Sequence, residues 1–189
     1  MVKKIFAGID EVGRGCLAGP VISCALILKK NVNKKCIKDS KTISFKNREK
    51  IAKYIKKNSW YAIGYASVKE IDKYNIFNAT LLSMERAIKK LKKKPHLFLV
   101  DGTHAPKKLK NSKTIIKGDK KVKCISAASI VAKVYRDLYM IKLSNKFPKY
   151  KWHKNFGYGT SQHLNALKKF GATSYHRRSY KPVHNILSK

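Results

Sequence analysis

Two short runs of apolar, largely branched side chains stand near the start of the chain, at residues 3–10 and 21–28. The residues between them include three glycines and a proline, which favour turns over regular structure. This order predicts two strands joined by a glycine-rich loop. Any fold for this chain therefore has to begin with that pair of strands.

Helical and strand patterns then alternate along the rest of the chain, and no internal repeat or low-complexity linker divides it. The expected helices are 43–57, 76–91, 124–143 and one from Thr160 or Ser161 to Gly171, and the expected strands are 60–67, 96–102 and 114–118. This arrangement predicts an α/β fold with a central mixed sheet flanked by helices. A chain of 189 residues is expected to form a single domain, 1–189, in which residues from about 142 to 189 form a C-terminal helical segment or appendage.

The charge of the chain is extreme, with 44 Lys and Arg against 10 Asp and Glu and a net charge of +34. Such a surface concentrates polyanions, which makes nucleic acid the expected partner and predicts binding that weakens steeply with salt. Compositional drift is an equally weighted explanation for the size of the excess, because all but six of the basic residues are lysines.

The sequence predicts a soluble, cytoplasmic protein with no membrane partner. No stretch approaches the roughly 20 apolar residues of a membrane span, and the N-terminus lacks a signal-peptide pattern. The four cysteines show neither CxxC pairing nor a histidine at zinc-site spacing, so free thiols are expected.

Four of the ten acids fall where a surface role is not the default. Asp10 and Glu11 are expected at the carboxyl end of the first strand, Asp101 ends the run LFLVD, and Asp137 borders the apolar stripe of its helix, one turn after Lys133. If the two strands are parallel or near neighbours, their acids converge at one sheet edge, provided that the first strand bends or ends there. The other six acids are expected to pair or cap at the surface.

Clustered carboxylates repel one another, and binding hard divalent cations relieves the repulsion. Two such ions can assist both the attacking and the leaving oxygen of a phosphodiester displacement. Each acid taken alone is better explained as a helix cap, a lysine partner or a turn residue. Taken together in a strongly basic chain, they favour a metal-dependent nuclease.

The chain closely resembles the ribonuclease HII family along nearly its whole length. The matching segments are AGIDEVGRGCLAGPV at 7–21, DSK at 39–41, NIFNAT at 75–80, LVDG at 99–102, IKGD at 116–119, ISAASIVAKVYRD at 125–137, GYGT at 157–160 followed by His163, and HRRSYKPV at 176–183. The resemblance implies a ribonuclease H-like fold. It also implies four metal-site carboxylates, matched by Asp10, Glu11, Asp101 and Asp137, which serve catalysis with Mg²⁺ or Mn²⁺.

The same resemblance implies the substrate and the residues that select it. The family cuts the RNA strand of RNA/DNA hybrids and incises on the 5′ side of ribonucleotides embedded in duplex DNA, leaving 3′-hydroxyl and 5′-phosphate ends. Gly13, Arg14 and Gly15 match the loop that senses the ribose 2′-hydroxyl, and Tyr158 matches the tyrosine that stacks on the next sugar. Further residues in substrate-lining motifs are Lys41, Asn75 and Asn78, with helix capping as the alternative for the asparagines.

Several basic residues near these motifs are expected to meet the nucleic acid backbone or solvent. Arg136 and Lys133 flank Asp137 and are interpreted as phosphate contacts or solvated side chains, and Arg177 and Arg178 as backbone contacts or surface ion pairs. Two features depart from the family pattern. Cys16 replaces a common proline after the GRG tripeptide, which is expected to loosen the loop, and HKNFG at 153–157 replaces HKG.

Two other functions remain open at this point. A non-catalytic basic RNA-binding protein would explain the charge but not the strand-end acids, and a DNA-specific nuclease of the same broad fold would explain both. The protein is expected to be a monomer. A replication-machinery partner is possible in this family, although VHNILSK at the C-terminus shows no evident clamp-binding peptide.

Overall fold

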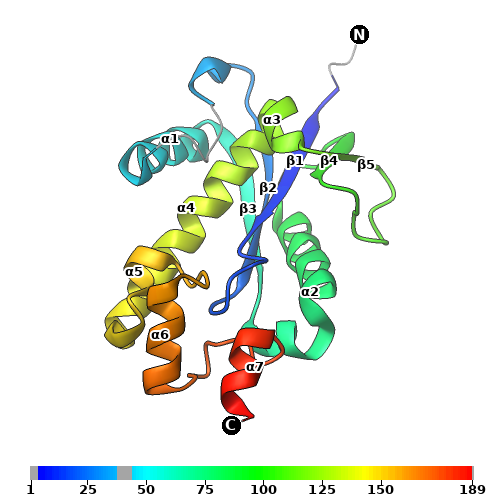
Figure 1. Cartoon of the computed structure of the whole chain (residues 1–189). Helices are drawn as coiled ribbons and strands as arrows, with labels where there is room; N and C mark the ends of the chain where they lie inside the picture. The colour runs from blue at the N-terminus through cyan, green and yellow to red at the C-terminus, as the bar shows by residue number, and fades with distance from the viewer. Residues whose placement is uncertain (1–3, 38–43, 189) are drawn as a thin grey trace.

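The computed structural model describes residues 4–37 and 44–188, which form a five-stranded sheet with helices on both faces (Figure 1). The strands are β1 (Phe6–Val12), β2 (Val21–Leu28), β3 (Ser59–Ala66), β4 (Leu97–Asp101) and β5 (Ser112–Ile115). The helices are η1 (Lys34–Cys36), α1 (Phe45–Lys57), α2 (Val68–Lys90), α3 (Gly118–Lys121), α4 (Lys123–Lys146), η2 (Pro148–Tyr150), α5 (Trp152–Asn155), α6 (Ser161–Phe170) and α7 (Lys181–Leu187).

The sheet is mixed, as predicted, with the strand order β3-β2-β1-β4-β5. The strands β1, β2 and β3 are antiparallel, whereas β4 and β5 run parallel to β1. The pairing of β1 with β4 ends at Ile9↔Val100, so Asp10 and Asp101 are level with each other one residue further on. This is the parallel neighbour relationship that convergence of the two strand-end acids requires.

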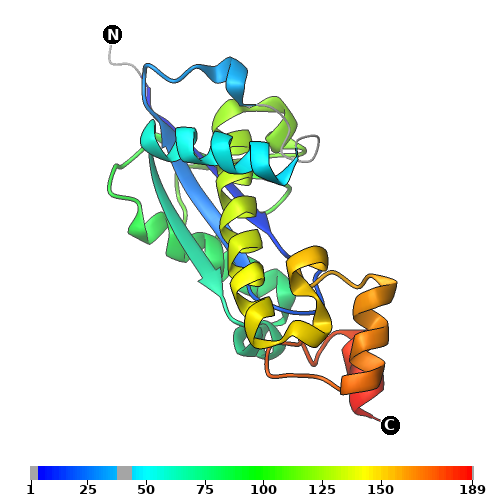
Figure 2. The same cartoon turned by 90° about the vertical axis from the view of Figure 1, so that its left-hand side faces the viewer.

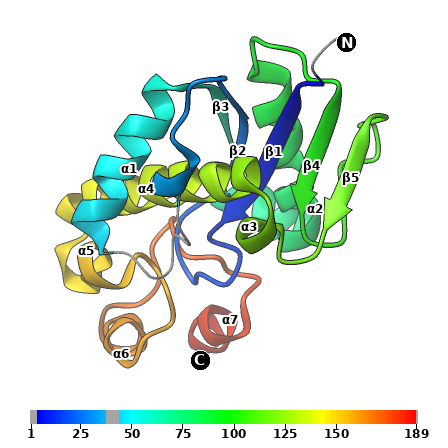
Figure 3. The same cartoon turned by 90° about the horizontal axis from the view of Figure 1, so that it is seen from above.

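Helices cover the two faces unequally (Figure 3). One face packs against α4 and α1 through a cluster that includes Leu26, Ile55, Ile130 and Val131. The other face packs against α2 through Ile9, Ile27, Met84 and neighbouring apolar side chains. The buried sheet thus holds the ends of β1 and β4 in fixed positions relative to α4.

The helices α5, α6 and α7 gather at one end of the molecule, beyond the loop that joins β1 to β2 (Figures 1 and 2). Leu17 of this loop packs with Leu167 and Val183, and Ala18 packs with Met140 and Trp152. The C-terminal helical segment therefore contacts the glycine-rich loop directly. The division of the chain into domains stays a prediction.

The first strand differs from its predicted bounds of 3–10. It begins at Phe6 and continues through both acids to Val12, because β2 pairs with it as far as Val12↔Ile22. The apolar pattern stops at Asp10, so only the partner strand extends the element. The expectation that the strand ends at the acids is therefore wrong.

The predicted helix 76–91 also begins earlier than expected, at Val68. Ser67 and Glu70 form a reciprocal capping box at its start, a sequence signal that the apolar periodicity does not contain. The other predicted elements agree with the structure to within a few residues, and the Thr160 side chain accepts a hydrogen bond from the His163 amide at the start of α6, as its type predicts.

Gly8 lies where α4 approaches β1 most closely. A Cβ at this position would lie 2.2 Å from the carbonyl carbon of Cys124 and 2.4 Å from the amide nitrogen of Ile125. Both are backbone atoms of the first turn of α4, so only glycine allows this packing. Among the described residues, no helix combines the length and apolar character needed to cross a membrane.

Candidate active site

A cavity of about 370 Å³ lies where β1, β4, α3, α4 and the glycine-rich loop meet. It contains both acidic and basic groups. Its lining comprises the acids Asp10, Glu11, Asp101 and Asp119, the cations Arg14, Arg48 and Lys133, and Val12, Gly13, Gly15, Ser129 and Tyr158. Three of the four predicted metal-site carboxylates therefore share one cavity with most of the residues predicted to select the substrate.

Asp10 and Asp101 come from the adjacent parallel strands β1 and β4. The Asp10 side chain is 5% exposed and accepts a hydrogen bond from the Glu11 amide at 2.7 Å. Burial raises the pKa of Asp10 well above its usual value, and repulsion from Glu11 and Asp101 raises this pKa further. Asp101 accepts a hydrogen bond from the Gly118 amide at 2.6 Å, through Oδ1.

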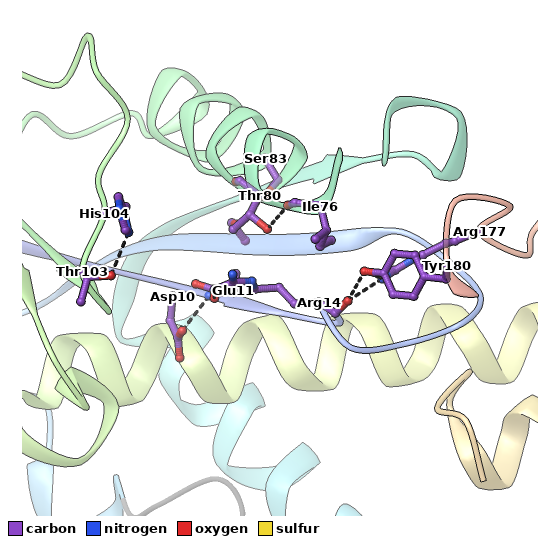
Figure 4. A network of polar contacts seen from close by, with 11 residues as sticks. Asp10, Glu11, Arg14, Ile76, Thr80, Ser83, Thr103, His104, Arg177 and Tyr180 are labelled. Atoms are coloured by element: carbon purple, nitrogen blue, oxygen red, sulfur yellow. Dashed lines mark hydrogen bonds and ion pairs between the residues drawn. The ribbon is translucent and has the colours of Figure 1, made fainter. Parts of the chain in front are cut away.

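Glu11 also lines the cavity, although adjacent residues of a regular strand point to opposite faces. The register of β1 with β4 stops at Ile9, so Glu11 lies past the last paired residue on that side. Its carboxylate lies 3.3 Å from Arg14 Nη1 (Figure 4). Burial raises the pKa of Glu11, whereas the charge of Arg14 lowers it.

Asp137, the fourth predicted carboxylate, is fully buried on α4 and is not part of the cavity lining. Its Oδ1 lies 2.9 Å from Lys133 Nζ and its Oδ2 lies 3.4 Å from Arg48 Nη1. Both cations line the cavity, so Asp137 is joined to it through them. The structure thus brings three acids together and holds the fourth behind two cations.

The donor set has the chemistry that a hard divalent cation requires, because it consists of carboxylate oxygens. The mutual repulsion of Asp10, Glu11 and Asp101 is the condition that a bound cation relieves. In the described part of the chain, no group of three or more His, Cys, Asp or Glu side chains forms a ready metal site. The acids fit a divalent metal in type and charge, and Asp137 is engaged by Lys133 and Arg48.

The glycine-rich loop and Tyr158 form one side of the cavity. An isolated β-bridge joins Cys16 to Tyr158, and the Leu17 amide donates to the Gly157 carbonyl at 2.8 Å. The Tyr158 ring is 39% exposed and lies 5.5 Å from Lys133 Nζ. Burial raises the pKa of Tyr158 to about 12, so the hydroxyl stays protonated. Cys16 is buried and belongs to this bridge. The bridge therefore holds the loop at the position where replacement of proline by cysteine was expected to loosen it.

The structure does not bring Asn75 to the cavity. It has a positive φ of 64° at a kink within α2, and its Oδ1 accepts a hydrogen bond from the Asn78 amide at 3.0 Å. Asn75 therefore caps the second part of the helix, and its contact with a substrate stays a prediction. Lys41 lies outside the described residues.

Arg136 and Arg177 are not surface residues, contrary to the expectation that they contact phosphate, solvent or a surface partner. Both are 0% exposed and donate to backbone carbonyls of the glycine-rich loop and its neighbours. Only Arg178 is exposed as expected. The arginines are buried because several carbonyls from distant segments converge on each guanidinium, which no local pattern reveals.

Three polar residues of the cavity were missed by sequence reasoning. Asp119 was interpreted as a surface acid, although it belongs to the IKGD segment quoted for the family resemblance. Ser129 forms a side-chain hydrogen bond with Asp10, and Arg48 contacts Asp137. Ser129 also belongs to a quoted family segment, ISAASIVAKVYRD at 125–137, whereas Arg48 carried no sequence signal because it reaches the cavity only through the packing of α1.

A larger hollow of about 840 Å³ lies elsewhere, near the start of β1 and the start of α4. Its lining combines apolar side chains with lysines, including Lys29, Lys34 and Lys123, and contains no carboxylate. It therefore lacks the groups that hydrolysis requires, and the chemistry belongs to the smaller, acidic cavity.

Two buried histidines lie behind Tyr158. The Thr173 amide donates to His176 Nδ1 at 2.9 Å, so His176 carries its proton on Nε2 and donates to His163 Nε2 at 3.1 Å. His163 Nε2 also accepts from Trp152 Nε1 at 3.0 Å, and His163 Nδ1 donates to the Tyr158 carbonyl at 2.9 Å. The network is complete only when both imidazoles are neutral.

This network predicts acid sensitivity of the fold. Burial and the neighbouring His163 lower the pKa of His176 to about 3, and burial lowers the pKa of His163. A lowered histidine pKa contributes stability that is complete above the unfolded-state pKa of about 6.5 and is lost as pH falls below it. We expect His176 alone to reduce the free energy of unfolding by about 2 kcal/mol between pH 7 and pH 5.

Urea unfolding at a series of pH values measures this effect. A His176→Gln variant should show a flatter dependence over the same range, because it removes one of the two titrating groups. His184→Gln, which changes an exposed histidine of α7, should keep the dependence of the unaltered protein. If the free energy of unfolding of His176→Gln fell with pH as steeply as that of the unaltered protein, His176 would not be the source of the acid sensitivity.

Comparisons with known proteins agree on one family. The family model described as ribonuclease HII matches residues 7–183. A ribonuclease HII from Pelagibacter ubique is 56% identical over 186 residues, which are 97% of this chain and 100% of the relative. Among solved structures, ribonuclease H2 from Pyrococcus horikoshii matches with a TM-score of 0.82 and 26% identity, covering 97% of each chain. The ribonuclease HII of Archaeoglobus fulgidus, solved as a complex with PCNA, matches with a TM-score of 0.79 and 26% identity, covering 94% of this chain and 95% of that one.

Proposed function

Since the chain belongs to the ribonuclease HII family and is a ribonuclease H enzyme with a ribonuclease H-like fold, we propose that it incises duplex DNA on the 5′ side of embedded ribonucleotides. It also cuts the RNA strand of RNA/DNA hybrids. The observation that carries the proposal is the shared cavity in which Asp10, Glu11 and Asp101 face the glycine-rich loop and Tyr158. Hydrolytic groups and ribose-selecting groups are thereby within reach of one nucleotide.

In this proposal, Asp10, Glu11, Asp101 and Asp137 hold divalent ions, either Mg²⁺ or Mn²⁺. Bound there, the ions supply the positive charge that activates water and stabilises the leaving oxygen in phosphodiester hydrolysis. Asp10 and Asp101 are held by backbone amides at 2.7 and 2.6 Å, which fixes the direction of their oxygens. Asp137 is paired with Lys133 and Arg48 in this structure, so an ion bound by its carboxylate would have to replace these cations.

The remaining cavity residues position the substrate. A ribose can approach the backbone of Gly13, Arg14 and Gly15 closely, because the two glycines carry no side chain. Its 2′-hydroxyl can both donate hydrogen bonds to this backbone and accept them from it. The half-exposed Tyr158 ring offers a flat apolar surface for the adjoining sugar. Lys133, whose Nζ lies 5.5 Å from the centre of this ring, offers a cation to a phosphate of the bound strand.

An end-labelled duplex with a single ribonucleotide tests the proposal directly. We expect a nick on the 5′ side of the ribonucleotide in Mg²⁺ or Mn²⁺, no nick in EDTA and no nick in the all-DNA duplex. Equal cutting of the all-DNA duplex would favour a DNA-specific nuclease. Binding without any nick of single-ribonucleotide or hybrid substrates, at all Mg²⁺ and Mn²⁺ concentrations, would favour a non-catalytic RNA-binding protein.

A further inference from the structure

Two buried arginines hold the glycine-rich loop through its backbone carbonyls. Arg177 donates to the carbonyls of Gly13 at 2.6 Å, Arg14 at 2.8 Å and Gly19 at 2.9 and 3.0 Å. Arg136 donates to the carbonyls of Ala18 at 2.9 Å, Pro20 at 3.0 Å and Phe156 at 2.8 Å. Arg177 therefore joins the outgoing part of the loop, which contains the ribose-selecting tripeptide, to Gly19 of the returning part, and Arg136 holds the residues on either side of Gly19.

These contacts are unusual for arginine because neither guanidinium has a carboxylate partner within residues 4–37 and 44–188. A buried charge is costly unless it is fully hydrogen-bonded. Here the oxygen ends of peptide dipoles surround each cation, and the rigid fork of five N–H donors requires them to lie in fixed directions. The cation and the loop carbonyls consequently orient each other.

The orientation of a carbonyl determines the orientation of the amide that follows it. A trans peptide is planar and its C=O and N–H groups point in opposite directions, and the described residues contain no cis peptide bond. Because the Gly13 and Arg14 carbonyls point inward to Arg177, the amides of Arg14 and Gly15 point the other way. No acceptor in the described part of the chain takes either amide, and both residues line the acidic cavity.

Tyr180 contacts the Arg14 carbonyl on the side where Arg177 lies (Figure 4). Its hydroxyl donates to the Arg14 carbonyl and accepts from Arg177 Nη1 at 3.0 Å, and its ring centre lies 5.1 Å from the guanidinium carbon. Gly13 has a φ of 94°, and a Cβ there would lie 2.2 Å from Arg136 Nε. The loop conformation and the two arginines are thus fitted to each other.

We propose that Arg177 is a positioning residue that sets ribonucleotide selectivity by turning the Arg14 and Gly15 amides toward the sugar at the scissile position. This inference rests on the proposed function. Arg177 is fully buried and acts through the loop, so it has no direct contact with the substrate. The Arg177→Lys substitution keeps the positive charge but loses the fork that reaches three carbonyls at once.

The test compares kcat and KM of Arg177→Lys on a duplex with one ribonucleotide and on a continuous RNA/DNA hybrid. Misplacing a positioning group by about 1 Å costs on the order of 100-fold in rate, and we expect this loss in kcat on the single-ribonucleotide duplex. In the hybrid every nucleotide of the RNA strand carries a 2′-hydroxyl, so the enzyme can bind at many positions along that strand. We therefore expect the loss of kcat on the hybrid to be at least about tenfold smaller. Arg86→Lys is the matched control, because it makes the same exchange at an arginine that binds Glu70 and the Tyr65 carbonyl and does not contact the loop.

The outcomes separate this inference from the function it rests on. If the unaltered protein does not nick the single-ribonucleotide duplex, the proposed function fails. If it does, and folded Arg177→Lys keeps the unaltered ratio between the two substrates, the positioning role is overturned. If Arg177→Lys does not fold, Tyr180→Phe decides the question, because it removes one donor to the Arg14 carbonyl and should shift the ratio in the same direction by a smaller factor. An unchanged ratio in Tyr180→Phe would then overturn the inference.

Discussion

Replacing Asp101 with asparagine is expected to reduce cleavage of a single-ribonucleotide duplex by on the order of 1,000-fold while the protein stays folded and bound to its substrate. Asp101 is level with Asp10 across the β1–β4 pair, and its charge contributes to the raised pKa of Asp10. The amide of asparagine keeps an oxygen to accept the Gly118 amide but removes the negative charge that a divalent ion requires.

Circular dichroism and fluorescence anisotropy in EDTA check folding and binding of this variant, and a quantitative nicking assay checks the rate. Removing one negative charge from the cavity should leave the affinity for duplex unchanged or raise it, because the substrate is a polyanion. Glu85→Gln is the matched control, since it removes an acid of α2 that does not line the cavity. Activity of Asp101→Asn within tenfold of the unaltered protein would eliminate its assigned metal-binding role.

The Gly8→Ala substitution is expected to lower the free energy of unfolding by about 3 kcal/mol or more. The added Cβ would lie 2.2 Å from a backbone carbon of Cys124, so no side-chain rotation relieves the clash and α4 must move away from β1. Since α4 carries Ser129, Lys133 and Asp137, the same shift should reduce nicking activity in the fraction that still folds.

Urea unfolding followed by fluorescence measures the loss of stability. Gly15→Ala provides the comparison, because a Cβ at Gly15 meets no atom within 4 Å and Gly15 is not among the glycines with positive φ. Its unfolding free energy should stay within about 0.5 kcal/mol of the unaltered protein. If Gly8→Ala had the same free energy of unfolding as the unaltered protein, α4 could not pack against β1 as closely as described.

The sequence by itself determined the element types and most of the candidate site. Apolar periodicity depends on neighbours within a few residues, so it predicted the mixed α/β arrangement and nearly all long helices and strands. The chain has only ten acidic residues, and few of them interrupt or end an apolar run. Asp10, Glu11 and Asp101 therefore stand out by their sequence positions alone. The ordered family motifs added the glycine-rich tripeptide and Tyr158, and the cavity contains both.

Only the tertiary structure decided which groups meet and which are buried. The parallel register of β1 with β4 makes Asp10 level with Asp101, and the packing of α1 against α4 brings Arg48 to Asp137. Residue type alone assigned Arg136 and Arg177 to the surface, because a lone cation is costly to bury. Their burial is possible because backbone carbonyls surround each guanidinium, and all but that of Phe156 come from residues more than 100 positions away. Such compensation between distant segments exists only after the chain has folded.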